Sequence, residues 1–258
     1  MKKAVAIAVS VILICAFTVT GFSAAEAQSW YCVRNKDHRQ PVLSADLNYV
    51  ENIGGYYIDH RHGDGSEEKV VYLTFDAGYE NGNVEKILDV LKQKQATGAF
   101  FILGNLVTKN TELVKRMADE GHLVCNHTNS HPDMTTKVTL EDFRAELESL
   151  ENIYREYTGR ELSKYFRPPE GRFNKETLEF AQDLGYKTIF WSFAYEDWDN
   201  NKQPSFEAAK RKILDNIHNG AVILLHPTSE TNAAVLGEVI DELRSMGYTF
   251  GTLDELTA

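Results

Sequence analysis

Two histidines separated by four positions, His127 and His131, are the first candidates for metal chemistry in this 258-residue chain. If the segment between them makes one helical turn, both imidazoles point to the same side and can share a divalent ion, with zinc or a related nitrogen-accepting metal preferred. Two solvent-facing or hydrogen-bonded histidines would have the same spacing. The pair therefore indicates a metal site only in combination with partners from elsewhere in the chain.

A carboxylate and a third imidazole each follow a short apolar run. Asp76 comes after residues 70–75 and His226 after residues 221–225. A carboxylate beside a metal ion and its bound water can act as a general base, and an imidazole can protonate a departing amine. The alternatives are an Asp that caps a loop and a His that is simply hydrogen-bonded in the core.

Arg167 is followed by Pro168 and Pro169. Each proline fixes its own backbone angle and disfavours helix in the residue before it, so the guanidinium is carried on a stiff, extended segment. An always-charged fork could orient Asp76 and keep it ionised, and a purely structural ion pair is the alternative. A patch of aromatic residues predicts either core or an apolar wall for a sugar face or an acetyl methyl: Phe190, Trp191, Tyr195 and Trp198.

The elements that must position these residues begin near residue 70. From there, short apolar runs alternate with amphipathic segments, which predicts repeated β-α units. The expected strands are residues 70–75, 98–103, 122–126, 165–167, 187–192, 221–225 and 248–251, and the expected helices are 83–95, 110–120, 140–157, 175–184, 206–217 and 233–246. Seven such units predict a closed or nearly closed parallel barrel. The candidate residues all follow strand ends, and those ends share one rim of a barrel, where the connecting loops build active sites.

The chain divides into three expected parts. Residues 1–27 have a basic start, an apolar run and a small-x-small end, which predicts an export signal peptide, with an uncleaved membrane anchor as the alternative. Residues 28–68 are interpreted as an N-terminal extension and residues 69–258 as the main α/β domain. The net charge of −11 argues against a nucleic-acid partner or an anionic membrane surface. Outside the signal, Cys32 and Cys125 are the remaining cysteines, and a disulfide between them is possible, although Cys125 has the surroundings of a buried apolar residue.

The ordered motifs resemble those of the polysaccharide deacetylases with a NodB-homology domain over about residues 69–258. The resemblance rests on Thr-Phe-Asp at 74–76, His-Thr-x-x-His at 127–131, Arg-Pro-Pro-x-Gly at 167–171, Asp-Trp at 197–198 and Leu-x-His at 224–226. It implies an α/β fold, a distorted (β/α)7 barrel, and hydrolysis of N-acetyl groups on glycans with a divalent metal, zinc first and manganese, cobalt, magnesium or calcium as alternatives.

The same resemblance implies a role for each matching residue. Asp76 would be the base and His226 the acid. Arg167 would orient the base and Asp197 would tune the acid. His127 and His131 would bind the metal. The substrate would be bound by Tyr79, Pro168, Pro169, Gly171, Trp198 and Leu225.

The sequence departs from the usual family pattern at two positions. Ala77 stands where a metal-binding Asp is typical, which predicts either weaker metal binding or a ligand from another residue. Ala194 replaces an Asp in the fourth motif. With Gly-Tyr-Glu-Asn-Gly at 78–82, the chain resembles the delta-lactam-biosynthetic de-N-acetylases of spore-forming bacteria. That subgroup implies a monomer acting on N-acetylmuramic acid in peptidoglycan, in the spore cortex, after an amidase has removed the peptide stem. Other acetylated glycans, and a noncatalytic glycan-binding barrel, are the alternatives.

Overall fold

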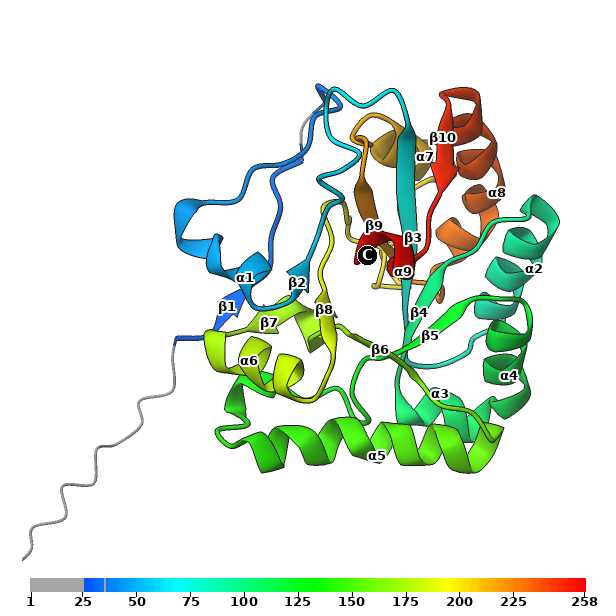
Figure 1. Ribbon diagram of the computed structural model, residues 1–258. Helices are drawn as coiled ribbons and strands as arrows, with labels where there is room; N and C mark the ends of the chain where they lie inside the picture. The colour runs from blue at the N-terminus through cyan, green and yellow to red at the C-terminus, as the bar shows by residue number, and fades with distance from the viewer. Residues whose placement is uncertain (1–25, 35) are drawn as a thin grey trace, which may run out of the picture.

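The computed structural model describes residues 26–34 and 36–258, so the predicted signal peptide lies outside the described residues except for its last two positions. Its centre is a parallel sheet curved into an incomplete barrel (Figure 1). The seven barrel strands are β3 (Lys69–Ala77), β4 (Ala99–Ile102), β5 (Leu123–Asn126), β6 (Ser163–Phe166), β8 (Lys187–Ile189), β9 (Ala221–Leu225) and β10 (Tyr248–Phe250). The expected distorted (β/α)7 barrel is confirmed.

Helices cover the outside of this sheet, with the long α5 crossing below it in Figure 1. They are α2 (Val84–Lys94), α3 (Gly104–Lys109), α4 (Thr111–Asp119), α5 (Leu140–Thr158), α6 (Lys175–Asp183), α7 (Phe206–Leu214), α8 (Glu230–Ser245) and the short C-terminal α9 (Leu253–Leu256). Six were expected from the sequence, and α3 and α9 were not, because each is too short to show an amphipathic period. No helix of the described part of the chain is long and apolar enough to cross a bilayer.

The barrel strands do not close into one continuous ladder. β3 pairs with β4 on one path and with β9 through Val71–Phe75, whereas β8 is not paired with β9. Two isolated bridges span this opening, Phe193 to Ile223 and Ile58 to Ala221. The second bridge comes from the N-terminal extension, which therefore helps to complete the barrel wall.

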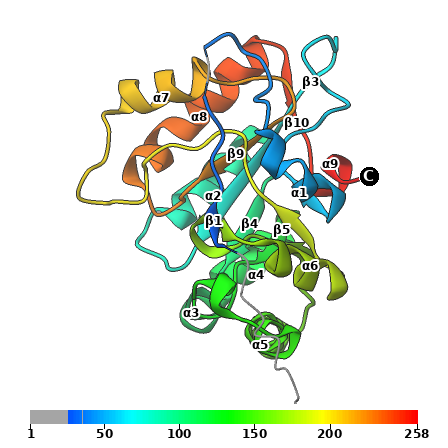
Figure 2. The same cartoon turned by 90° about the vertical axis from the view of Figure 1, so that its left-hand side faces the viewer.

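The extension is blue in Figures 1 and 2 and lies against the side of the barrel formed by β7 (Arg172–Phe173), β8 and α6. Its β1 (Gln28–Ser29) pairs with β7 and its β2 (Gly55–Tyr56) pairs with β8, with the short α1 (Tyr49–Asn52) between them. Trp30 anchors this layer, because its ring stacks on Phe190 at 4.1 Å between centroids. The burial of aromatic rings contributes strongly to the stability of such a contact.

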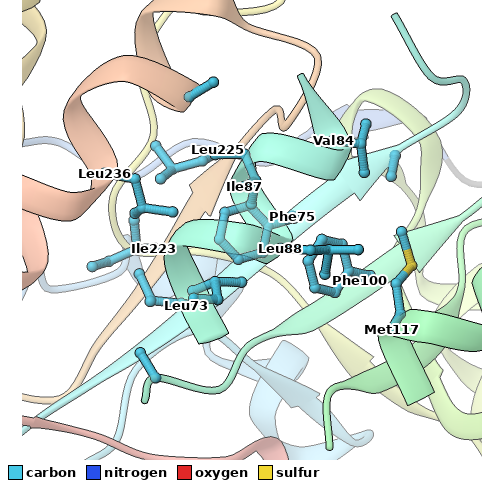
Figure 3. Close-up of a cluster of buried hydrophobic side chains, with 14 of the residues drawn as sticks. Leu73, Phe75, Val84, Ile87, Leu88, Phe100, Met117, Ile223, Leu225 and Leu236 are labelled. Atoms are coloured by element: carbon cyan, nitrogen blue, oxygen red, sulfur yellow. The ribbon is translucent and has the colours of Figure 1, made fainter. Parts of the chain in front are cut away.

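The side chains of each strand point alternately into the barrel and out toward the helices. On β3, Leu73 and Phe75 point outward and pack with Ile87 of α2 and Leu236 of α8, as Figure 3 shows. Tyr72 points inward to a second cluster inside the barrel. Because successive side chains of a strand point to opposite faces, Asp76 shares the inward face of Tyr72 at the carboxyl end of the strand.

Candidate active site

A buried ion pair lies at the carboxyl ends of β3 and β6. The Arg167 guanidinium is fully buried and its Nη1 donates to Asp76 Oδ1 at 2.8 Å. Its Nη2 donates to Thr74 Oγ1 at 2.9 Å, and its Nε donates to the Ile189 carbonyl at 2.9 Å. With these acceptors in place, one face of the guanidinium lies 4.2 Å above the Phe101 ring centre. The arginine is thus fixed on several sides and can present only one geometry to the carboxylate.

This arrangement keeps Asp76 ionised. Burial alone would raise the pKa of its carboxyl group, but the Arg167 guanidinium, with the His127 and His226 rings, holds that pKa below its usual range. A carboxylate needs positive neighbours to stay charged in a low-dielectric site. Its second oxygen, Oδ2, is 3.6 Å from His127 Nε2. The free lone pairs of that oxygen are therefore available to accept a proton from a bound water.

The two metal candidates converge on this carboxylate, but not through a helical turn. The His127 and His131 ring centroids are 5.0 Å apart, and the segment that joins them is a loop with positive φ at Thr128 (75°) and His131 (61°). Asn126 Oδ1 accepts from the Thr128 N-H at 2.8 Å and Thr128 Oγ1 accepts from the His131 N-H at 2.9 Å. The segment does not make the helical turn that was considered as one way to bring the imidazoles together; instead, these side-chain hydrogen bonds hold a loop that places the two rings side by side.

His127 is prepared as a nitrogen ligand. Its Nδ1-H donates to the Arg167 carbonyl at 2.9 Å, so its Nε2 carries the bare lone pair. Burial lowers the pKa of the imidazole to about 4, so it is neutral near pH 7. A neutral imidazole whose second nitrogen is fixed by a hydrogen bond is the form that binds metals.

The donor set fits a divalent ion only in part. Ala77 is buried in the outer core cluster and offers no ligand. Among the residues that the structure describes, no group of three His, Cys, Asp or Glu side chains is placed to hold a metal ion. Two imidazoles can still bind one if water or substrate oxygens complete the coordination shell, as they do at open catalytic sites. Position 77 therefore supplies no ligand, and the two imidazoles are the nitrogen donors that would hold the ion.

The third imidazole faces the same pocket from β9. His226 Nδ1-H donates to Asp197 Oδ1 at 2.7 Å, and the His226 backbone N-H donates to Asp197 Oδ2 at 2.8 Å. Asn232 Nδ2 donates to the same Oδ2 at 2.6 Å, which completes the buried carboxylate's partners. Burial alone would lower the pKa of His226, but the Asp197 carboxylate raises it above its ordinary value. The ring is therefore held as an acid with Nε2-H directed away from Asp197.

Replacing Asp197 by Asn should move the alkaline limit of activity to lower pH. A group with a raised pKa stays protonated to higher pH and loses its proton as pH rises through that value. Without the carboxylate, His226 would lose its proton earlier, so kcat/KM should begin to fall at lower pH than in the wild type. Acetate release measured across pH tests this, and an unchanged alkaline limb would show that Asp197 does not act through His226.

Two adjoining hollows open over these residues. The larger, about 540 Å³, reaches toward Trp191 and Leu224, and the smaller, about 260 Å³, reaches toward Tyr79 and Thr228. Both are lined by the same central residues: Asp76, His127, His131, Trp198 and His226. Trp198 is 56% exposed at their shared edge, with its ring centroid 6.0 Å from that of His226. The combined hollow is within the size range of small-ligand sites.

The structure brings three of the six expected substrate-binding residues to the hollows. Tyr79, Gly171 and Trp198 line them. Pro168 and Pro169 are buried and do not line them. Leu225 does not reach them either, because it points outward into the core between β9 and α8 (Figure 3). Its neighbour Leu224 lines the larger hollow instead, as strand alternation requires.

Several lining residues were not proposed as site residues from the sequence, among them Leu103, Thr228, Glu170 and Ala194. Glu170 and Ala194 border the larger hollow. Glu170 occupies the variable position of the Arg-Pro-Pro-x-Gly motif. Its position between Pro169 and Gly171, both expected to bind substrate, was the sequence signal that could have placed it at the site. The two cysteines, for which a disulfide was possible, are free and buried.

Comparison with known proteins identifies the family to which this chain belongs. The family model described as polysaccharide deacetylase matches residues 63–189. The chain is 39% identical to the peptidoglycan-N-acetylmuramic acid deacetylase PdaA of Bacillus subtilis over 250 residues, which cover 94% of this chain and 93% of that protein. The solved structure of PdaA, a family 4 carbohydrate esterase, has a TM-score of 0.83 at 40% identity, covering 90% and 97% of the two chains. The chain belongs to the polysaccharide deacetylase family.

Other members act on a different sugar. The peptidoglycan-N-acetylglucosamine deacetylase PgdA of Listeria monocytogenes is 36% identical over 192 residues, 73% of this chain and 39% of PgdA. A family 4 carbohydrate esterase from Bacillus anthracis has a TM-score of 0.72 at 37% identity over 90% of this chain and 96% of that one. As a polysaccharide deacetylase, the protein is a hydrolase of carbon-nitrogen bonds, in a family whose members generally depend on a metal ion.

Proposed function

We propose that the protein removes the acetyl group from N-acetylmuramic acid in peptidoglycan, releasing acetate and a free amino sugar. The observation that carries the chemistry is the convergence of Asp76, His127 and His226 on one hollow. Arg167 is buried behind Asp76 and bonded to its carboxylate. Support for the muramic sugar comes from PdaA, because that likeness includes the N-terminal extension as well as the barrel. N-acetylglucosamine is the second candidate, supported by the likeness to PgdA.

In this mechanism Asp76 accepts a proton from the attacking water while Arg167 keeps the carboxylate in place. A divalent ion held by His127 and His131 would polarise the acetamide carbonyl and lower the pKa of a bound water. His226, with its pKa raised by Asp197, then protonates the departing nitrogen. The base and the acid therefore come from the ends of different strands, β3 and β9.

The remaining residues of the hollow fit a sugar and its acetyl group. Trp198 and Tyr79, 56% and 44% exposed, offer aromatic faces, and Leu224 with Trp191 offers an apolar wall for the methyl group. Asn200 Nδ2 donates to the Tyr79 hydroxyl at 2.9 Å, which joins the loops on either side of the smaller hollow. Aromatic faces bind the apolar side of a sugar ring without choosing among sugars.

The setting of the enzyme follows from this substrate. We propose that residues 1–27 direct export, that residues 28–68 and 69–258 act together as a monomer at the cell wall, and that peptidoglycan strands, not nucleic acids, are its partners. A muramic delta-lactam, the product expected in a spore cortex, needs both a free amine and a lactyl carboxyl released from its peptide stem. An amidase that cuts the stem is therefore the second enzyme required.

The proposal is tested by acetate release from defined glycans. Purified protein should deacetylate oligosaccharides that contain N-acetylmuramic acid, and mass spectrometry of the products should place the mass loss on the muramic residue. Chitin-type oligosaccharides, which lack muramic acid, serve as the comparison. Faster loss of acetate from those would replace the muramic sugar by N-acetylglucosamine, and no release from either, with divalent metal supplied, would refute the proposed activity.

Replacing His131 by Ala should weaken metal binding by about tenfold or more, since one of only two nitrogen donors is lost. Titration of zinc followed by calorimetry measures this directly, without reference to turnover. The matched control is His218→Ala. His218 is buried outside the hollows, and its Nδ1-H donates a hydrogen bond to the Asn219 carbonyl. Equal zinc affinity in wild type and His131→Ala would remove His131 from the metal site.

A further inference from the structure

Asn232 contacts both members of the buried pair formed by Asp197 and His226. It lies in the first turn of α8, and its side chain is buried. Its Nδ2 donates to Asp197 Oδ2 at 2.6 Å and to the His226 carbonyl at 3.1 Å. Both amide hydrogens are thus used within this pair, and one side chain joins the carboxylate of Asp197 to the backbone of His226.

Asp197 needs a fixed point outside this pair. Within the described chain, the other two hydrogen bonds that its carboxylate accepts come from His226 itself, through the ring Nδ1-H and the backbone N-H. Those bonds alone would let the carboxylate and the imidazole shift together. Asn232 removes this freedom, because its own backbone N-H donates to Ser229 Oγ at 3.0 Å, at the N-cap of α8. The carboxylate is therefore held against a helix, which positions a catalytic group more precisely than a loop does.

Tyr195 fixes the orientation of the Asn232 amide. Its hydroxyl donates to Asn232 Oδ1, which leaves Nδ2 to face Asp197. An ionised carboxylate only accepts hydrogen bonds, so the reversed amide would set two acceptors against each other. Burial, together with the Asp197 charge, raises the pKa of Tyr195, so the hydroxyl keeps its proton well above neutral pH. The hydrogen bonds therefore run in one direction, from Tyr195 to Asn232 to Asp197.

We propose that Asn232, oriented by Tyr195, is a positioning residue that holds Asp197 against His226 and limits the pull of the carboxylate on the imidazole proton. The inference rests on the proposed function, in which His226 is the acid. A hydrogen bond to a carboxylate stabilises its charge and weakens its attraction for a neighbouring proton. Asp197 thus keeps His226 protonated before the reaction, and Asn232 keeps it acidic enough to give that proton to the departing nitrogen.

The other charged groups around His226 do not depend on Asn232. Burial and Asp197 have the largest effects on the pKa of His226, and Asp76 and Arg167 act on it in opposite directions. The larger hollow also contains the titratable side chains of His127, His131 and Glu170. Within the described chain, Asn232 has a hydrogen bond to none of these five residues. A substitution at Asn232 therefore changes the pKa of His226 through Asp197.

Asn232→Leu tests this role, because it removes the amide and keeps a side chain of similar size. The pKa of His226 should rise by about one unit, since Asp197 Oδ2 loses a donor. A group with a raised pKa keeps its proton to higher pH. The alkaline limit of kcat/KM should therefore move to higher pH, opposite to the shift expected for Asp197→Asn. At the optimum, kcat should fall by about tenfold with little change in KM, because the imidazole is less well aligned.

Two measurements follow the same proton. Acetate release from N-acetylmuramic acid oligosaccharides across pH gives the alkaline limit. NMR titration of isotope-labelled histidine rings gives the pKa of His226 without turnover, and the signal absent from His226→Ala identifies that ring. Tyr195→Phe removes only the hydroxyl that orients the amide, and it should shift both quantities in the same direction by a smaller amount. This milder variant keeps the test open if Asn232→Leu does not fold.

Thr231→Val is the matched control for a purely structural role. Thr231 is buried at the adjacent position of α8, and its Oγ1 donates to the Pro204 carbonyl at 2.9 Å, so it supports the loop that follows Asp197. This variant should unfold at a lower temperature and keep the alkaline limit of the wild type. A pKa of His226 that is unchanged or lowered in the folded Asn232 and Tyr195 variants, or raised equally by Thr231→Val, would overturn the inference. Absence of acetate release by the wild type would instead overturn the proposed function.

Discussion

Asp76→Asn should reduce acetate release by about a thousandfold, because an amide cannot accept the proton of the attacking water. The loss should appear in kcat, since the carboxylate acts while the water attacks and Asn has nearly the same shape. Acetate release under saturating substrate, measured by a coupled assay, gives this value. Near-normal turnover would refute the assignment of Asp76 as the base.

The same substitution should also reduce stability. Arg167 is fully buried, and the Asp76 carboxylate is the anion that compensates its charge. Removing one partner of a buried ion pair leaves an uncompensated charge and costs about 3 kcal/mol. Thr74 and the Ile189 and Phe190 carbonyls still accept from the guanidinium, so the fold should persist. Denaturant unfolding measures the change, and activity must be assayed well below the melting temperature of the variant.

A nearby carboxylate gives the control for Asp76. Glu196 is exposed one residue before the buried Asp197, and Glu196→Gln changes the net charge by the same amount. This variant should keep nearly full turnover and stability. A comparable loss in both variants would mean that the charge of the rim, and not proton transfer by one carboxylate, controls the rate.

Much of the site could be predicted because strand alternation and barrel geometry act together. Asp76, His127, Arg167 and His226 each continue the inward-facing register of a strand: Tyr72 precedes Asp76 by four positions, and Cys125 and Tyr165 precede His127 and Arg167 by two. In a parallel barrel those ends share one rim, so residues far apart in the sequence meet. The same rule would have excluded Leu225, because it lies one position out of register with His226.

Other features depend on contacts that no local pattern reveals. The loop from His127 to His131 takes its shape from hydrogen bonds to Asn126 and Thr128 side chains, and a spacing of four residues fits that loop as well as a helical turn. The closing of the barrel by β2 and by the bridge from Ile58 depends on pairing across more than 130 residues of sequence. Long-range pairing of two-residue strands leaves no periodic signal.

The extension is therefore more than an appendage to the barrel. Trp30 donates its Nε1-H to the Trp191 carbonyl at 2.8 Å, and the preceding residue, Phe190, supplies a carbonyl that accepts from Arg167 at 3.2 Å. Trp191 itself lines the larger hollow. One short segment thus contacts the extension on one side and the base-orienting guanidinium on the other. The extension therefore supports the segment that holds the Arg167 guanidinium.

His226→Ala should lower kcat for an N-acetylated glycan, the amide substrate, by about a hundredfold or more and should change KM much less. A general acid acts in the step in which the nitrogen departs. The residue is suited to that step, since Asp197 raises its pKa and leaves Nε2-H free toward the hollow. An acetyl ester with a good leaving group, such as 4-nitrophenyl acetate, does not need that proton. The variant should therefore lose far less activity on the ester than on the amide.

This pair of substrates distinguishes the acid from the base. Asp76→Asn should lose activity on both the ester and the amide, because the attacking water is needed in each case, whereas His226→Ala should be selective for the amide. Trp198→Ala serves as the control for contact with the substrate, since it borders the same hollows without a titratable group, and it should raise KM. If His226→Ala also raised only KM, the imidazole would be a binding residue, and the proton for the departing amine would have to come from water.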